Sequence, residues 1–199
     1  MTKNIVFLLL FSAVVCGQNK NKELIKFTPE ASFAFSSQLY IGENYLSKGH
    51  NDGIGAYFKM NFVTYKKFKL GIQFEKTTQK VTDKAIGGNI NKTNSNNLGG
   101  VISYQAFTKN KIAFEPQLKI AEVTLRQKDG SKYYGSQSGT QVGISSDVIF
   151  KLNKTLSIFT NIGYNYSFLK VETSPEYKDY FNNSQSINIS IGLIIKEYV

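Results

Sequence analysis

The sequence predicts an all-β fold, an eight-stranded antiparallel up-and-down transmembrane β-barrel with short turns at one end and four longer loops at the other. Along eight segments, apolar residues alternate with small polar ones at a period of two. The connections between these segments are long and short in strict alternation. After residue 17, no apolar run is long enough for a membrane helix. The 199 residues suit one domain.

The clearest alternation lies in residues 139–169, which predict a hairpin. On its second strand Ile158 and Ile162 share one face, whereas Asn161 and Gly163 share the other. The link between the strands is a short polar turn, which is typical of a β-hairpin.

The composition of the polar face indicates which face meets water. Solvated strand faces are usually rich in Lys, Glu and Thr, but this face is mostly Gly, Ser, Asn and Gln. Small polar side chains suit a narrow lumen and leave the apolar face to lipid. We therefore expect the aliphatic and aromatic side chains to point outward into a membrane.

The first three expected strands are residues 31–41, 54–63 and 68–76. In each strand every second residue is predominantly apolar. A polar loop at residues 42–53 separates the first two strands, and a short Tyr-Lys-Lys turn separates the second and third.

The fourth and fifth strands are expected at residues 98–107 and from Lys111 to Ala121. The loop before them, residues 77–97, is rich in Asn, Thr, Gly and Lys. Pro116 removes a ladder hydrogen bond from the fifth strand, and the alternation slips beyond Ala121, as at a bulge or a membrane boundary.

The hairpin supplies the sixth and seventh strands, between polar loops at residues 127–138 and 172–184. The eighth strand begins near Ser186 and has an Ile or Leu at every second position, which is the cleanest alternation in the chain. The connections thus follow the order expected of a barrel with both termini on the periplasmic side.

The N-terminus predicts export. Residues 1–17 have the basic start, the apolar stretch and the small final residues of a signal peptide, so we expect a short periplasmic leader at 18–30 and the barrel at 31–199. Cys16 is the only cysteine, and lipid attachment to it is the alternative to its removal. If it is removed, the mature chain has no disulfide or thiolate.

The net charge of +10 indicates a negatively charged partner. The lysines are scattered rather than clustered with aromatic residues, which argues against nucleic acid. For an exported protein, outer-membrane lipid and lipopolysaccharide are the expected partners.

With its signal peptide, strand count, loop alternation and apolar final strand, the chain resembles the small eight-stranded outer-membrane barrels of the OmpA/OmpX type. The resemblance is to the form common among Bacteroidetes, and it covers residues 31–199. It implies an outer-membrane location and permits an accessory role in a secretion or gliding apparatus. The last residue, Val199, departs from the aromatic residue usual in the family.

Eight strands enclose an interior just wide enough for side chains to fill. The charges on the polar face must then pair with one another or with trapped water, because an unpaired buried charge is costly. We expect such a network rather than a conducting path. Its members are Lys59, Lys69, Glu75, Glu115, Lys119, Asp147 and Lys151.

A catalytic site is the lesser alternative. The only histidine, His50, lies in a loop near Ser47, and some barrels of this size modify lipid A with a histidine and a serine. A lone loop histidine is usually solvated, and the sequence contains no cluster with metal-ligand spacing and no phosphate-binding loop. We expect no enzyme activity, metal or cofactor.

The expected function is that of a monomeric, integral outer-membrane barrel whose loops serve adhesion, envelope integrity or docking to an envelope or surface protein. Loop lysines are candidates for contact with lipopolysaccharide phosphates: Lys80, Lys84, Lys92, Lys128, Lys132 and Lys178. The competing hypothesis is a soluble secreted or periplasmic barrel that buries its apolar face around a small apolar ligand.

Overall fold

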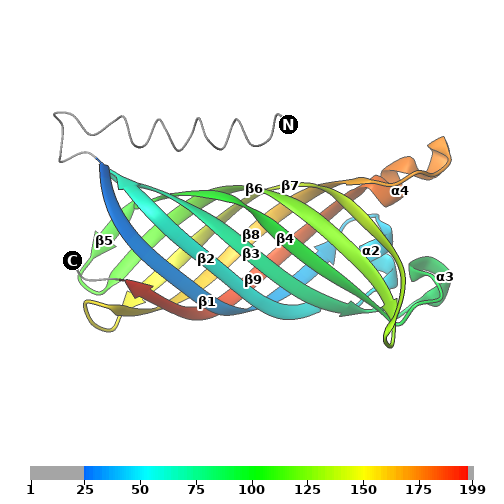
Figure 1. The fold of residues 1–199 in the computed structure, drawn as a ribbon, viewed down its shortest axis with the longest axis horizontal. Helices are drawn as coiled ribbons and strands as arrows, with labels where there is room; N and C mark the ends of the chain where they lie inside the picture. The colour runs from blue at the N-terminus through cyan, green and yellow to red at the C-terminus, as the bar shows by residue number, and fades with distance from the viewer. Residues whose placement is uncertain (1–24, 197–199) are drawn as a thin grey trace.

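The computed structural model describes residues 25–196. The expected signal peptide, Cys16 and most of the expected leader lie outside the described residues. The described residues form nine strands and a few short helices, and the strands dominate the fold (Figure 1). None of the helices in this part of the chain is long and apolar enough to cross a bilayer.

The strands follow one another around a closed wall. Their bounds are β1 Ile25–Ile41, β2 Gly53–Tyr65, β3 Phe68–Lys80, β4 Lys92–Tyr104, β5 Phe107–Lys109, β6 Ile112–Asp129, β7 Lys132–Lys151, β8 Leu156–Lys170 and β9 Asn183–Lys196. The helices are α2 Tyr45–Gly49, α3 Lys84–Gly87, the 3-10 helix η1 Pro175–Tyr177 and α4 Lys178–Asn182. All of the helices lie between strands at one end of the barrel, the loop end (Figure 1).

The wall closes because β1 pairs with β9 as well as with β2, and β4 pairs with β6. All pairings are antiparallel, and only the short β5 remains outside the closed ring of eight. At the closing seam Ala34 pairs with Gly192. A Cβ at Gly192 would lie 1.9 Å from the Phe33 carbonyl oxygen, so only glycine fits this close approach.

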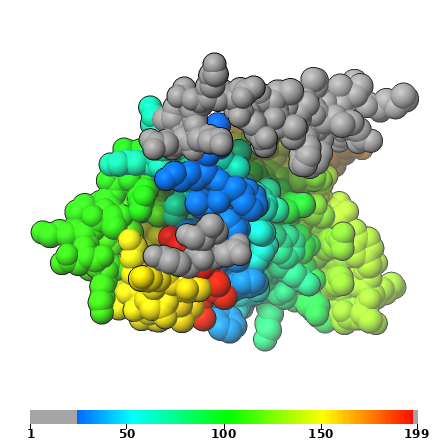
Figure 2. Space-filling view, turned by 60° about the vertical axis from the view of Figure 1, so that its left-hand side comes forward, coloured from blue at the N-terminus to red at the C-terminus, as the bar shows by residue number. Residues whose placement is uncertain are grey.

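At the opposite end, the turn end, the strands are joined by short connections (Figure 1). Figure 2 shows this end, where the β7–β8 turn in yellow and the start of β1 in blue lie beside the end of β9 in red. The expected fold class, a closed eight-stranded antiparallel barrel, is confirmed.

The outward face carries the apolar side chains. Ile162, Ile189 and Ile191 are 58%, 51% and 58% exposed, whereas Gly163 and Ser190 point inward and are buried. A soluble barrel would bury the first three residues and expose the last two. The expected sidedness is therefore the one that the structure has.

Several expected boundaries differ from the structure. The fourth strand, expected to reach Phe107, ends at Tyr104, and Phe107–Lys109 form the separate β5. The third loop, expected at residues 127–138, is a hairpin tip, because β6 continues to Asp129 and β7 begins at Lys132. The second loop is also shorter than expected, because β3 and β4 extend into polar sequence as far as Lys80 and Lys92. Strand β1 begins at Ile25, so residues 25–30 belong to the wall rather than to a leader.

The strand extensions at the loop end invert the usual polarity. On β6, Val123 and Leu125 point inward and are buried, whereas Glu122 and Arg126 are exposed. The slip expected beyond Ala121 is therefore not a break in the strand. It marks the level at which the outside changes from apolar to polar and the inside from polar to apolar.

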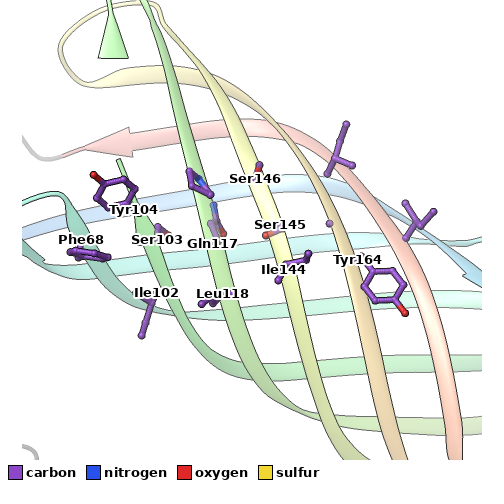
Figure 3. Close-up of a pocket in the computed structure, with 14 residues that line it drawn as sticks. Phe68, Ile102, Ser103, Tyr104, Gln117, Leu118, Ile144, Ser145, Ser146 and Tyr164 are labelled. Carbon is purple, nitrogen blue, oxygen red and sulfur yellow. The ribbon is translucent and has the colours of Figure 1, made fainter. Parts of the chain in front are cut away.

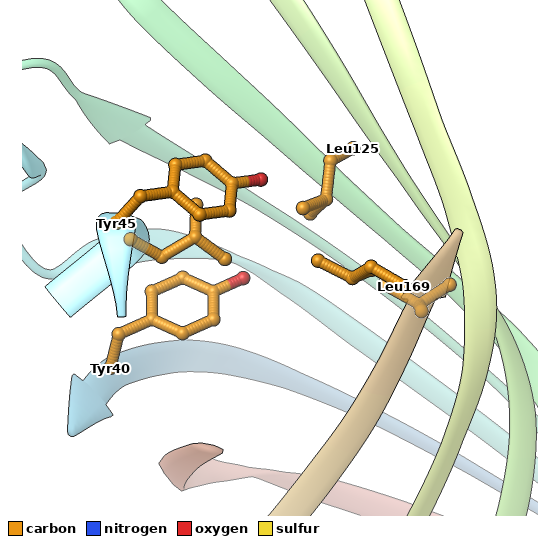
Figure 4. Packing of buried hydrophobic residues seen from close by; sticks show 6 residues of the cluster. Tyr40, Tyr45, Leu125 and Leu169 are labelled. Carbon is orange, nitrogen blue, oxygen red and sulfur yellow. The ribbon is translucent and has the colours of Figure 1, made fainter. Parts of the chain in front are cut away.

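Residues of the inverted region form an apolar cluster beneath the loops (Figure 4). Leu125 and Leu169 come from the wall, and Tyr45 and Leu46 come from α2 and fill the space above Tyr40. Helix α2 is held by its N-cap, since the Asn44 side chain accepts hydrogen bonds from the backbone of Leu46 and Ser47. The cluster caps the loop end of the lumen.

A lysine on the outward face tests its contact with lipid. Ile191 lies in the middle of the outward apolar series of β9, so we expect Ile191→Lys to destabilise the barrel in phosphatidylcholine vesicles by about 2–4 kcal/mol. Gln185→Lys, at the loop end of the same strand, is the control and should cost about 0–1 kcal/mol. Urea unfolding in vesicles measures both values. Equal costs would contradict the membrane placement.

Candidate functional site

The lumen is the first candidate site, because polar side chains fill its middle. Buried glutamine, asparagine, serine and threonine side chains project into it from every strand of the closed ring. Many of them are hydrogen-bonded to one another, as where Gln38 accepts from Thr77 at 2.6 Å and Asn165 donates to Asn188 at 2.7 Å. A second apolar cluster, which includes Tyr57, lies on the same inward face.

One buried ion pair joins opposite walls. The Lys59 ammonium on β2 lies 2.5 Å from the Asp147 carboxylate on β7, and both side chains are fully buried. Asn161 on β8 donates a hydrogen bond of 2.6 Å to the other oxygen of Asp147. A buried ion pair is tolerated when the remaining lone pairs are satisfied in this way.

A second group of charges is centred on Lys69 on β3. Its ammonium lies 2.7 Å from Glu115 on β6 and 3.1 Å from Glu30 on β1. Lys196 on β9 lies 2.7 Å from the same Glu30 carboxylate. The expected network omitted Glu30 and Lys196. Their positions in the alternation, two residues before Ser32 and two after Ile194, were the signal that would have placed them inside.

The other expected lumen charges are arranged differently. Glu75 accepts hydrogen bonds from Ser36 and from Asn188, the latter at 2.7 Å, rather than pairing with a lysine. Lys119 projects inward over Gly143, and Lys151 lies half-buried at the turn end. Within residues 25–196, neither of these two lysines takes part in an ion pair.

The loop end is the second candidate site, and His50 is part of its packing. His50 follows α2, where its Nε2 lies 2.8 Å from the Thr93 hydroxyl and its ring meets Tyr45 edge-on. Burial lowers the pKa of His50 below its usual value, so the imidazole is neutral at pH 7. Ser47 directs its hydroxyl to the carbonyl oxygens of Gly42 and Asn44, where it supports the helix cap.

Three of the six loop lysines lie together in a row. Lys80, Lys92 and Lys128 stand side by side on three neighbouring strands, because Lys92 pairs with both of the others. Lys132 follows at the start of β7, while Lys84 and Lys178 lie in α3 and α4. None of the six forms an ion pair within the described part of the chain. Three like charges across a sheet repel one another, which favours an anion beside them.

A hollow of about 660 Å³ lies against the outside of the wall near Pro116 (Figure 3). The pairing of β4 with β6 ends at Ser103 and Gln117. Pro116 is the preceding residue of β6, so it lies just beyond the β4–β6 ladder. Ile102, Leu118 and other outward residues line the hollow, and none of its lining residues is charged. This chemistry fits lipid chains against the wall. Residues 25–196 contain no group of three potential metal ligands among His, Cys, Asp and Glu.

The Lys59–Asp147 pair gives a test of the lumen. Lys59→Met leaves Asp147 buried without its partner, so we expect a loss of about 3–5 kcal/mol in the free energy of unfolding. The double variant Lys59→Met, Asp147→Leu should regain most of that loss. Urea titrations of the four proteins form a double-mutant cycle, and additive costs would show that the two groups do not interact.

The loop-end cap should loosen in acid. Because burial lowers the pKa of His50, its stabilising effect is complete above about pH 6.5 and is lost as the pH falls toward the lowered value. Hydrogen exchange of residues 45–50 should therefore speed up at pH 5 relative to pH 7.5. In His50→Gln the additional acid-dependent opening should disappear. An equal pH response in both proteins would assign the effect to other groups.

Comparison with known proteins shows which solved structures have a similar fold. No protein-family model and no curated protein matches the chain. Among solved structures, neisserial surface protein A superposes with a TM-score of 0.64 at 14% identity, over 88% of this chain and 100% of that one. Outer membrane protein OprG from Pseudomonas aeruginosa gives 0.55 at 8% identity, over 90% and 100%.

A third similar structure is Ail, the attachment invasion locus protein of Yersinia pestis. It gives a TM-score of 0.53 at 9% identity, over 86% of this chain and 99% of that one. At these identities the likeness concerns the fold alone. The chain has the fold of the small eight-stranded outer-membrane β-barrels.

Proposed function

We propose that the protein is an integral outer-membrane barrel without enzymatic activity, whose loop end makes contacts outside the cell. The observation that carries the proposal is the outward apolar face, where Ile162, Ile189 and Ile191 are more than half exposed. In water this surface would be a large aggregation-prone patch, whereas in a bilayer it meets hydrocarbon. The short connections then face the periplasm and the loop end faces outward.

The interior supports a structural rather than a transport role. The ion pair of Lys59 crosses the lumen, those of Lys69 lie nearer its turn end, and the apolar cluster that contains Tyr45 caps its loop end. An eight-stranded barrel leaves space only for side chains and a few waters. The proposed barrel therefore has no porin-like path for solutes.

The loop end supports contacts with envelope components. The row Lys80, Lys92 and Lys128 presents positive charge above the apolar band, where the phosphates of lipopolysaccharide are the nearest anions. Adhesion, envelope integrity and docking to a surface protein are the roles that such an end can serve. We propose that the barrel acts as a monomer and does not bind nucleic acid.

The two alternatives have less support. A soluble barrel around an apolar ligand needs an apolar lumen, but the middle of this lumen is polar and charged. A lipid A-modifying enzyme needs a histidine that activates a nucleophile. Here His50 is hydrogen-bonded to the Thr93 hydroxyl beneath the loops, and the Ser47 hydroxyl donates to backbone carbonyls rather than to His50.

Fractionation tests the proposal directly. The protein should stay in the membrane pellet after carbonate extraction, because its apolar wall is solvated by lipid. It should also migrate faster in gels before boiling than after, as a closed barrel does. A soluble periplasmic protein fractionated from the same cells is the control. Release as a soluble monomer without detergent would favour the ligand-binding alternative instead.

A further inference from the structure

A second hollow, of about 470 Å³, lies on the outside of the barrel at the level where the outward face changes polarity. Its lower side is formed by Leu98 on β4 and Ile120 on β6, which belong to the apolar band. Its upper side is formed by Glu122 on β6, Ser138 and Thr140 on β7, and Lys170 on β8. The hollow therefore joins an apolar surface to a polar one across three strand pairings.

The register of the sheet fixes the arrangement of the polar groups. Glu122 pairs with Leu98 on one side and with Thr140 on the other. Lys170 pairs with Ser138, so it lies across β7 from the Glu122 strand. The two charged residues thus stand two strands apart, about 10 Å across the sheet, with two hydroxyl side chains between them.

The charged groups of Glu122 and Lys170 have no ion-pair partner in the described structure. Glu122 and Lys170 are both exposed, and neither takes part in an ion pair within residues 25–196. The outward positions between them are short hydroxyl side chains, which leaves room between the charges. On the apolar side, Gly100 pairs with Ile120, and a Cβ there would meet no atom within 4 Å, so the outward surface is also open beside Ile120.

We propose that this hollow binds the headgroup of a membrane lipid that carries both a phosphate and a primary ammonium group. Lys170 and the hydroxyls of Ser138 and Thr140 supply donors for the phosphate, and Glu122 accepts hydrogen bonds from the ammonium. The first methylene groups of the acyl chains lie on Leu98 and Ile120. The inference rests on the proposed membrane placement, which brings the headgroups of the outward leaflet, beside the lipopolysaccharide proposed to contact the lysine row, to this level.

The charge pattern selects among lipid classes. A lipid with phosphate alone satisfies Lys170 but places a second negative charge near Glu122. A choline headgroup carries positive charge but has no N–H to donate to the carboxylate. An ethanolamine-type headgroup meets both requirements, so selectivity for the N–H donor is the signature of this site.

Native mass spectrometry of the full chain in detergent tests the site. Phosphatidylethanolamine, phosphatidylcholine and phosphatidylglycerol with identical chains are added in turn, and the lipid-bound fractions are compared. We expect phosphatidylethanolamine to bind about tenfold more tightly than the other two, which corresponds to one charge-assisted hydrogen bond. Glu122→Gln should remove the preference for ethanolamine, and Lys170→Gln should weaken binding of every phospholipid.

Matched controls carry the same changes elsewhere. Glu176→Gln in η1 and Lys111→Gln at the turn end alter the same net charges away from the hollow and should leave binding unchanged. Equal binding of the three lipids by the unmodified protein, or equal losses in the control variants, would overturn the site. Soluble phosphoethanolamine should compete much more weakly than the acylated lipid, because it lacks the chains that lie on Leu98 and Ile120; equal potency of the two would overturn the apolar side of the site.

Membrane insertion is measured separately through the shift in gel migration on boiling. Insertion without lipid selectivity rejects the site and leaves the proposed function standing. Loss of insertion in the unmodified protein rejects the proposed function itself.

Discussion

The pairing of every wall strand on both of its edges is the constraint on which the structure depends. Lipid offers no hydrogen-bond partners to a backbone, so a sheet in a membrane must have no free edge. The chain meets this constraint by bringing its first and last described strands together, from Glu30 opposite Lys196 to Ile41 opposite Gln185. Once the ring closes at eight strands, its diameter is set, and so is the size of the side chains that the interior accepts.

A narrow interior explains the use of charge in the lumen. Three of the lumen ion pairs join strands that are not neighbours in the wall: Lys59 on β2 reaches Asp147 on β7, and Lys69 on β3 reaches Glu30 on β1 and Glu115 on β6. Hydrogen bonds of the wall connect only adjacent strands. The buried ion pairs therefore connect distant parts of the wall. Removing one partner would be costly, because the other charge would remain buried without a partner.

Much of this arrangement could be predicted from the sequence, because a period of two assigns each residue to one face. Five expected lumen residues, such as Lys59 and Asp147, are buried inside, and most of the expected outward isoleucines are exposed. Which charges pair could not be predicted, since the pairing depends on how strands far apart in sequence face each other across the ring. Glu30 was missed for another reason: the polar composition around it, with Pro29 beside it, is typical of a leader rather than a strand.

The least predictable region is the part of the wall beyond the apolar band. A strand that leaves a membrane keeps its alternation but exchanges the chemistry of its two faces, because water replaces lipid outside and the loops close over the lumen. On β6 the exchange takes place between Ile120, which is apolar and outward, and Val123, which is apolar and inward. Read from composition alone, the exchange resembles a slip or the start of a loop, which is why residues 127–138 were not expected to be strand. The same exchange places Glu122 directly beside Leu98, and it thereby creates a polar site at the edge of an apolar surface. A barrel wall that continues past the membrane thus obtains an interfacial site from its alternation alone, without an inserted loop or domain.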